Sequence, residues 1–519
     1  MRWQASMAAL VCGVLTLASP VVGQRELNQR IQAAIASSKV SGAKFSVSVR
    51  DLSSGVDLAD LDADAPMKPA SNMKLLTSGA ALLVLGTDFS FRTELVLEGP
   101  PGSERLIIVG SGDPALADPT VLDRMTPKVT VESLISQLAG AVKTAGVTRV
   151  TEVVVDDRVF DRQWVHPTWP RNQLDKWYCA PVAGVNFHAN VLCVYPSPSA
   201  DGDGRPPQIL IQPSASWIEI DNRAKTILSG NNSFWMSRQD RAEGENRFTL
   251  FGQVRQPAKQ PMEITLADVA KLTGQLIAVD LVRQGVAVGR GEASRDAALR
   301  AVRMAEMSEL FRGRTIAAIT THMPDILSRC NSDSHNLYAE ALIKRMGREV
   351  TGEPGSWTNG SSVVRMTIGQ AQRLGPRDAA ATVVVDGSGL SKENRVSARS
   401  LTRWLDEMQR DRKVGAAFIE SLATPRTSGS NLRRRFEKAG LTCSLNAKTG
   451  TIDEVRCLSG YLTDPRTGNR YAFSIMINGL RENMGDGPEA LACQDRIVGV
   501  IDRWISGAGT RANVTDSPR

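Results

Sequence analysis

The sequence predicts an α+β protein in which one principal domain is split by a large strand-rich insert. Helical and strand patterns alternate in residues 24–88 and return in 305–507. Between them, residues 89–304 are dominated by short apolar runs separated by Gly and Pro turns. A chain of 519 residues is also too long for one ordinary hydrophobic core. We therefore expect two or more domains.

The first segment is expected to end in a buried helix. A helix is predicted at 27–38, then two strands within 43–57 that turn at Ser53-Ser-Gly55. A largely apolar helix follows at 69–86 and should end near Gly86. A helix that is apolar on most faces belongs in the middle of a domain. The Ser and Lys on its first turn therefore need an explanation.

The insert is expected to form two subdomains. Its predicted strands are 91–97, 106–110, 150–155, 208–212 and 247–254, and its predicted helices are 131–145 and 266–284. Residues 196–207 are rich in Pro, Ser, Gly and Asp, which is typical of a loop.

The second segment should return to the principal domain. The predicted helices are 323–328, 334–346, 397–410 and 486–505, and the predicted strands are 382–385, 441–448, 460–463 and 471–477. Residues 508–519 are polar and are expected to form a loose tail.

Residues 1–23 have the pattern of an export signal. Arg2 supplies the positive start, residues 7–18 the apolar stretch, and Val21-Val-Gly23 a cleavage site. The apolar stretch is short for a membrane span. The alternative is a buried N-terminal helix, which Pro20 and Gly23 disfavour. We expect an exported protein of the periplasm or cell envelope.

The charge is modestly basic, with a formal net charge of +7 and a pI of about 9.1. An exported protein rarely meets nucleic acid, so we expect no nucleic-acid partner. Two interpretations remain open. The charge is suited to an anionic cell-envelope polymer or to peripheral contact with a membrane surface, or it only aids solubility.

Six cysteines remain if Cys12 leaves with the signal, and an even number in an exported chain suggests disulfides. The spacings suggest the pairs Cys179–Cys193, Cys443–Cys457 and Cys330–Cys493. No spacing is C-x-x-C and the four histidines are dispersed. We therefore expect no structural zinc site and no cofactor.

Ser71 and Lys74 form the first of three chemical motifs, Ser71-Asn-Met-Lys74. Residues at i and i+3 share one face of a helix. A serine hydroxyl needs a base, and a lysine can be that base only if burial or a second cation lowers its pKa. Lys448 is a candidate for that cation. The helix N-terminus also offers backbone N–H groups for an oxyanion.

Ser334-His-Asn336 is the second motif. Ser334 is suited to pass a proton between Lys74 and a leaving amine, and Asn336 to orient Lys74 or a substrate amide. The competing interpretation is a simple helix cap by Asp333 or Ser334, with His335 on the surface.

Lys448-Thr-Gly450, followed by Thr451, is the third motif and ends a predicted strand. Lys448 with the hydroxyls of Thr449 and Thr451 would clamp a carboxylate. Gly450 permits close approach of the ligand to the backbone. The alternative is a solvated lysine at a hairpin. The three motifs together predict acyl transfer by an activated serine.

The whole pattern resembles the class C low-molecular-mass penicillin-binding proteins, which are D-alanyl-D-alanine carboxypeptidases/endopeptidases of peptidase family S13. The matching strings are Pro69-Ala-Ser71-x-x-Lys-x-x-Thr77, Gly110-x-Gly-Asp-Pro114, Asn336-x-x-Ala-Glu340, Asp386-Gly-Ser-Gly-Leu-Ser391 and Lys448-Thr-Gly-Thr451. The long first gap, between Ser71 and Ser334, is where this family carries its insert. His335 stands where many relatives have Asp.

The resemblance implies a serine β-lactamase/DD-peptidase-like catalytic domain with inserted accessory domains. It implies Ser71 as nucleophile and Lys74 as base, supported by Ser334, Asn336 and Lys448. The backbone N–H groups of Ser71 and Thr451 would form the oxyanion hole. Thr449, Gly450 and Thr451 would bind substrate, with Ile452 and Arg395 near its side-chain pocket.

We therefore expect a serine DD-peptidase that acts on peptidoglycan stem peptides ending in D-Ala-D-Ala, or on their cross-links, and that β-lactams acylate. Two alternatives are a β-lactamase or esterase on the same domain, and a wall-binding scaffold with a weak site.

Overall fold

The structure is a computed structural model that describes residues 20–238, 246–373, 381–428, 430, 432–433, 435–436 and 440–512. The predicted signal at 1–23 lies almost wholly outside these residues, as does the end of the predicted tail. The helix α13 (Asp486–Ala512) continues past the predicted start of that tail at residue 508. Within the described residues, no helix combines the length and apolarity needed to cross a membrane.

The principal domain is built on a five-stranded antiparallel sheet. The strands are β1 (Lys44–Asp51), β2 (Asp57–Leu61), β17 (Ser444–Ile452), β18 (Val455–Thr463) and β19 (Arg470–Asn478), in the order β17-β18-β19-β1-β2. The pairing of β1 with β19 runs from Lys44↔Asn478 to Asp51↔Tyr471. The two ends of the chain therefore form one sheet, and the rest of the protein is inserted between them.

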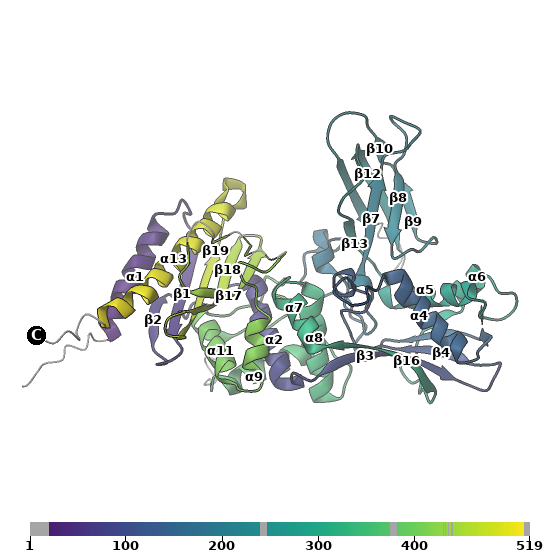
Figure 1. Cartoon of the computed structure of the whole chain (residues 1–519), viewed down its shortest axis with the longest axis horizontal. Helices are drawn as coiled ribbons and strands as arrows, with labels where there is room; N and C mark the ends of the chain where they lie inside the picture. Colours follow the sequence, from purple (N-terminus) through teal and green to yellow (C-terminus); the bar gives the residue numbers. More distant parts are fainter. Residues whose placement is uncertain are drawn as a thin grey trace, which may run out of the picture.

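Helices cover both faces of this sheet (Figure 1). On one face, α1 (Pro20–Ala36) and α13 pack against alternate sheet residues such as Phe473 and Ile475. On the other face lie α2 (Met73–Leu85), α8 (Asn336–Thr351), α9 (Trp357–Ala371) and α11 (Ala398–Arg410). Burial on both faces explains why β19 is apolar almost throughout.

The helix α2 lies at the centre of the second layer, as its apolar sequence predicted. It follows a short 3₁₀ turn, η1 (Ala70–Asn72). A Cβ at Gly79 would lie 2.7 Å from both Trp404 and Met408 of α11. The lack of a side chain at this position allows the two helices to approach each other closely.

The insert has its own sheet, in the order β15-β6-β4-β3-β16. The strands of this sheet are β3 (Ser90–Glu98), β4 (Arg105–Val109), β6 (Val153–Asp156), β15 (Val302–Met304) and β16 (Arg314–His322). The insert also contains the helices α3 (Pro119–Leu122), α4 (Val131–Thr144), α5 (Val269–Arg283) and α6 (Arg295–Arg300). Two short strands, β5 (Arg149–Val150) and β14 (Ala287–Val288), pair with each other. Because β16 pairs with β3, this sheet extends past the predicted boundary at residue 304.

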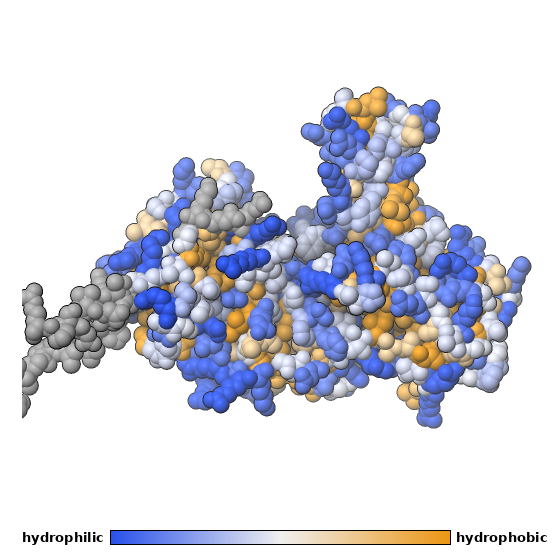
Figure 2. All heavy atoms as spheres, in the orientation of Figure 1, coloured by the Kyte–Doolittle hydropathy of each residue, from blue (hydrophilic) through white to orange (hydrophobic). Residues whose placement is uncertain are grey.

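A second part of the insert projects from the body as a narrow lobe (Figure 1). It contains β7 (Val191–Ser197), β8 (Gln208–Gln212), β9 (Glu219–Asn222), β10 (Lys225–Thr226), β11 (Ser233–Arg238), β12 (Arg247–Val254) and β13 (Met262–Thr265). Figure 2 shows a mainly hydrophilic surface on this lobe, with hydrophobic atoms at its tip and near its base.

Two sequence predictions are wrong here. No strand forms at 382–385, where Val383 makes only an isolated bridge to Arg395. The disulfides are also absent: the six cysteines of the described chain are buried free thiols. For Cys443 and Cys457 the reason is register. Cys457 pairs with Gly450, at the far end of β17 from Cys443, which separates the two cysteines by roughly 20 Å.

Candidate active site

Lys74 is the hub of the site. Its Nζ lies 3.0 Å from Ser71 Oγ, 2.7 Å from Asn336 Oδ1 and 3.0 Å from the carbonyl oxygen of Ser388. The Asn336 amide is fixed because its Nδ2 donates to the Tyr178 carbonyl at 2.8 Å. A neutral amine has two N–H donors and one lone pair. Because Asn336 Oδ1 and the Ser388 carbonyl can only accept, they take both donors, and the lone pair is left to face the Ser71 hydroxyl.

Burial prepares Lys74 to be neutral. The side chain is completely buried, and desolvation lowers its pKa from 10.5 to about 8, although the charges of Cys330, Glu340 and Asp386 act to raise it. An amine with a pKa near the working pH is suited to general-base chemistry. The predicted role of burial is thus supported by the structure.

Ser71 sits in the tight turn η1 rather than in the body of α2. The preceding Ala70 has a φ of +46°, a conformation that L-residues rarely adopt. The turn is enclosed by Gly389, whose Cβ would lie against the Ala70 carbonyl. Gly389 itself has a φ of +84°. Only glycine fits this position without strain. Because Gly389 has no side chain, the loop that contains it can pack directly against the turn that carries Ser71.

Lys448 and Ser334 form the second contact pair. Lys448 Nζ lies 2.7 Å from Ser334 Oγ and 2.9 Å from the Thr449 carbonyl oxygen. Burial, and then the nearby Lys74, lower the pKa of Lys448 well below its usual value. Because Lys74 and Lys448 are both buried and close together, protonation of one disfavours protonation of the other. A bound carboxylate beside Lys448 would restore its charged form.

The outer edge of β17 lies beside Ser71. The Ala447 N–H donates to the Ala423 carbonyl at 2.8 Å, on the side away from β18. Because N–H groups alternate in direction along a strand, those of Thr449 and Thr451 also point away from β18. A Cβ on Gly450 would lie 3.1 Å from Ser71 N. The edge therefore presents N–H groups next to the nucleophile.

A cleft of about 180 Å³ opens at these groups. It is lined by Ser71, Pro170, Gln173, Tyr178, Asn336, Leu390, Lys392, Thr451, Ile452 and Asp453. The predicted substrate residues Thr451 and Ile452 are thus at the cleft. Arg395 is not among the lining residues, since its Nη1 donates to the carbonyls of Lys392 and Asn394.

Several lining residues were missed by the sequence interpretation. Tyr178 belongs to the insert and contributes a backbone carbonyl, for which no side-chain motif exists. Lys392 and Asp453 form an exposed pair at 3.5 Å, and nothing in the sequence links them. Lys392 does lie directly after the string Asp386–Ser391, which was the available signal.

His335 is buried, contrary to the surface position that the competing helix-cap interpretation gave it. Its ring lies 5.5 Å from Trp177 and 5.2 Å from Tyr338, measured between ring centroids. Burial, with the charge of Arg329, lowers the pKa of His335 to about 3. The residue is therefore a neutral packing group beneath the Ser334 turn.

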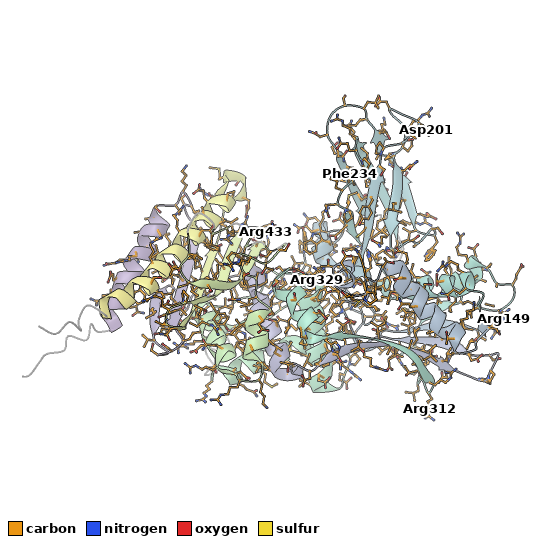
Figure 3. All side chains as sticks on the ribbon, in the orientation of Figure 1. Arg149, Asp201, Phe234, Arg312, Arg329 and Arg433 are labelled. Carbon is orange, nitrogen blue, oxygen red and sulfur yellow. The ribbon has the colours of Figure 1, made fainter. Side chains whose placement is uncertain are left out.

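A buried ion pair with the insert supports the turn that carries Ser334. Asp118 Oδ2 accepts from Arg329 Nη2 at 2.8 Å and from Tyr338 Oη at 2.6 Å. Arg329 belongs to α7 (Met323–Asn331), and its carbonyl accepts from the His335 N–H at 3.0 Å. Figure 3 shows Arg329 in the middle of the molecule, between the principal domain and the insert. The insert thus anchors the segment that carries Ser334, whose φ is +61°.

No group of His, Cys, Asp and Glu side chains within the described residues is arranged to hold a metal ion.

Comparisons with known proteins find a matching family model and several relatives. A model of the D-Ala-D-Ala carboxypeptidase 3 (S13) family matches residues 27–502. A D-alanyl-D-alanine carboxypeptidase from Actinomadura sp. (strain R39) is 31% identical over 498 residues, covering 91% of this chain and 84% of its own. The D-alanyl-D-alanine carboxypeptidase DacB of Haemophilus influenzae is 23% identical over 431 residues, covering 81% and 82%.

Solved structures show the same fold. Penicillin-binding protein 4 of H. influenzae superposes with a TM-score of 0.68 at 20% identity, covering 87% of this chain and 93% of its own. Its complex with a β-lactam gives a TM-score of 0.66, also at 20% identity, covering 90% and 98%. The predicted α+β fold of the serine DD-peptidase type is confirmed.

Proposed function

The chain belongs to the D-Ala-D-Ala carboxypeptidase 3 (S13) family and is a serine DD-carboxypeptidase/endopeptidase, and we propose that Ser71 is its nucleophile and Lys74 its base. The observation that carries the assignment is the hydrogen bonding of Lys74. Two acceptor-only oxygens occupy its N–H groups, so its lone pair is directed at Ser71 Oγ.

In the proposed reaction, Lys74 removes the Ser71 proton as Oγ attacks the carbonyl of the penultimate D-Ala. The N–H groups of Ser71 and Thr451 stabilise the oxyanion. The C–N bond then breaks, the terminal D-Ala leaves, and an acyl-enzyme remains on Ser71. A proton returns to the leaving amine from Lys74 through Ser334. Water then hydrolyses the ester and regenerates the hydroxyl.

Lys448, Thr449 and Thr451 are proposed to bind the terminal carboxylate of the substrate. Support comes from the contact of Lys448 with Ser334 and from the place of Thr451 at the cleft. Asn336 is proposed to hold both Lys74 and the substrate amide. The same carboxylate and amide arrangement occurs in β-lactams, which are therefore proposed to acylate Ser71. Ile452 is proposed to contact the substrate side chain. Arg395 is proposed to act only indirectly, through its hydrogen bond to the carbonyl of Lys392, which lines the cleft.

We further propose that the protein is exported to the periplasm or cell envelope, with residues 1–23 as its signal peptide. The support is the charged, apolar and small-residue pattern of that segment. The location agrees with a peptidoglycan substrate.

The experiment is release of D-Ala from a soluble stem pentapeptide ending in D-Ala-D-Ala, measured for the wild type and for Ser71→Ala. We expect release by the wild type and none by Ser71→Ala. The matched control is Ser362→Ala, at an exposed position of α9 remote from the cleft, which should keep full activity. D-Ala release by Ser71→Ala at the wild-type rate would contradict the assignment.

A further inference from the structure

Glu340 is a buried carboxylate to which the reaction scheme above gives no task. It lies on α8, four residues after Asn336, and its side chain is completely inaccessible to solvent. Its Oε1 accepts from the Ser388 N–H at 2.8 Å. Its Oε2 accepts from the Gly387 N–H at 2.9 Å and from Trp357 Nε1 at 2.8 Å. Three donors thus converge on one carboxylate.

The loop held by Glu340 contacts α2 on its other side. The Ser388 carbonyl accepts from Lys74 Nζ at 3.0 Å, and the Gly387 carbonyl accepts from Thr77 Oγ1 at 2.8 Å. The N–H groups of these two residues therefore face Glu340 while their carbonyls face the helix that carries Lys74. A Cβ at Gly387 would lie 2.5 Å from the Ala339 carbonyl, so the loop lies directly against α8.

The loop that Glu340 holds supplies one of the two acceptors of Lys74. One of the two acceptor-only oxygens that occupy Lys74 is the Asn336 side chain, and the other is the Ser388 carbonyl. If the loop turned or moved outward, Lys74 would lose the second acceptor. An N–H would then be free to face Ser71, in place of the lone pair.

We propose that Glu340 is a positioning residue for acylation, because it aims the Ser388 carbonyl at Lys74 and so directs the Lys74 lone pair at Ser71. This inference rests on the proposed function, in which Lys74 is the base. Glu340 does not touch the substrate or the reacting atoms.

The charge of Glu340 adds a second, separable effect. Desolvation, with Asp386 nearby, raises the pKa of Glu340 to about 7. Its negative charge acts to raise the pKa of Lys74. The other charged or titratable groups that influence Lys74 or Glu340 are Cys330 of α7, His335 and Lys344 around α8, Asp386 of the loop and Lys448 of β17.

Two substitutions separate position from charge. Glu340→Gln removes the charge and turns one acceptor oxygen into an NH₂ group that faces N–H donors. Glu340→Asp keeps the charge, but its shorter side chain cannot reach both N–H groups of the loop. Both should slow acylation by about tenfold to a hundredfold, because a small misplacement of a reacting group costs about this much.

Their pH profiles should differ. In the wild type, the acylation rate falls as pH drops below about 8, where Lys74 becomes protonated. In Glu340→Gln, loss of a negative charge lowers the pKa of Lys74, so this fall should move to lower pH. In Glu340→Asp the pH at which the acylation rate falls should be the same as in the wild type. The matched control is Glu349→Gln, an exposed position on the same helix, which should leave both rate and profile unchanged.

The test is the second-order rate constant for acylation by a fluorescent penicillin between pH 5 and 10, on full-length protein. Slow acylation by both variants, with a shifted profile only in Glu340→Gln, supports the inference. Wild-type rates in either folded variant, or slow acylation by Glu340→Gln with an unmoved profile, overturn it. If Glu340→Gln does not fold, the rate of Glu340→Asp decides. An unlabelled wild type, or a labelled Ser71→Ala, would instead overturn the proposed function.

Discussion

At the scale of the residue, Lys74 shows how burial turns an ordinary cation into a base. Desolvation favours its neutral form, and two acceptors fix the direction of its lone pair. Neither effect needs a histidine or a metal. The spacing of Ser71 and Lys74 brings their side chains together, but the second acceptor comes from a loop more than 300 residues away in the chain.

Replacing Lys74 should reveal its role through both rate and pH dependence. We expect Lys74→Ala to slow acylation by a fluorescent penicillin by about 10²–10⁴-fold, the usual effect of losing a general base. The wild-type rate should rise as pH passes through about 8, and the variant should lose that rise. The control is Lys143→Ala on α4 of the insert, where Lys143 Nζ donates to the Gln284 carbonyl at 3.0 Å. A variant that keeps the pH-dependent rise would assign the base elsewhere.

At the scale of the element, the turn between α7 and α8 depends on a buried ion pair. Asp118, next to α3 of the insert, accepts from Arg329 of α7 and Tyr338 of α8. Burial acts to raise the pKa of Asp118, but the charge of Arg329 and the hydrogen bonds from Tyr338 and Arg329 hold it below its usual value. This stability is present at neutral pH and is lost as pH falls through the lowered pKa.

Asp118→Asn should therefore destabilise the fold. It removes one of the two carboxylates that pair with the buried Arg329. Breaking a buried ion pair typically costs about 3–5 kcal/mol in free energy of unfolding, and the remaining contact with Asp333 at 2.9 Å should keep the loss at the lower end of this range. The control is Asp221→Asn, which removes an exposed partner of Arg223 and should cost about 0–1 kcal/mol. Denaturant unfolding at pH 7 measures both. Equal stabilities for the two variants would show that the buried pair contributes little.

The elements also show what sequence patterns can and cannot predict. Hydrophobic patterning predicts α2, α4, α5, α8, α11 and most of the sheet strands, because each either buries a regular face or, like α2, is apolar on most faces. It fails at 382–385, where Thr382 and Val384 are buried and Val383 is exposed, as in a strand, but the run forms no strand and makes an isolated bridge at Val383. It also fails for Cys443 and Cys457, because their spacing suggests a hairpin but the register of β17 and β18 separates them.

At the scale of the whole molecule, the insert is continuous with the core of the principal domain. Phe160, Trp169 and Val182 of the insert share one hydrophobic core with α2 and α8. Trp169 Nε1 donates to Asp386, and Asp161 pairs with Lys344 at 2.7 Å. These contacts join segments far apart in sequence, so single-motif reasoning could not predict them. The three motifs were nevertheless identifiable, since each keeps its reactive side chains within four residues.

Hydrogen exchange should reflect this shared core. The hydrogen-bonded amides of Phe160, Trp169 and Val182 should be as strongly protected as those of α2 and α8, because these side chains belong to the common core. The strands of the projecting lobe, β9 to β11, serve as the internal comparison and should exchange faster. Exchange followed by mass spectrometry measures these segments in one sample. Fast exchange at Phe160, Trp169 and Val182 alongside protected α2 and α8 would mean that the insert folds as a separate unit.

The most direct test of the account is to locate the covalent adduct formed with benzylpenicillin. Intact-mass and peptide mass spectrometry should find one added penicilloyl group, on the peptide that contains Ser71. Ser71→Ala should gain none. An adduct on another serine, such as Ser334 or Ser388, or an undiminished adduct on Ser71→Ala, would contradict the assignment of Ser71 as nucleophile.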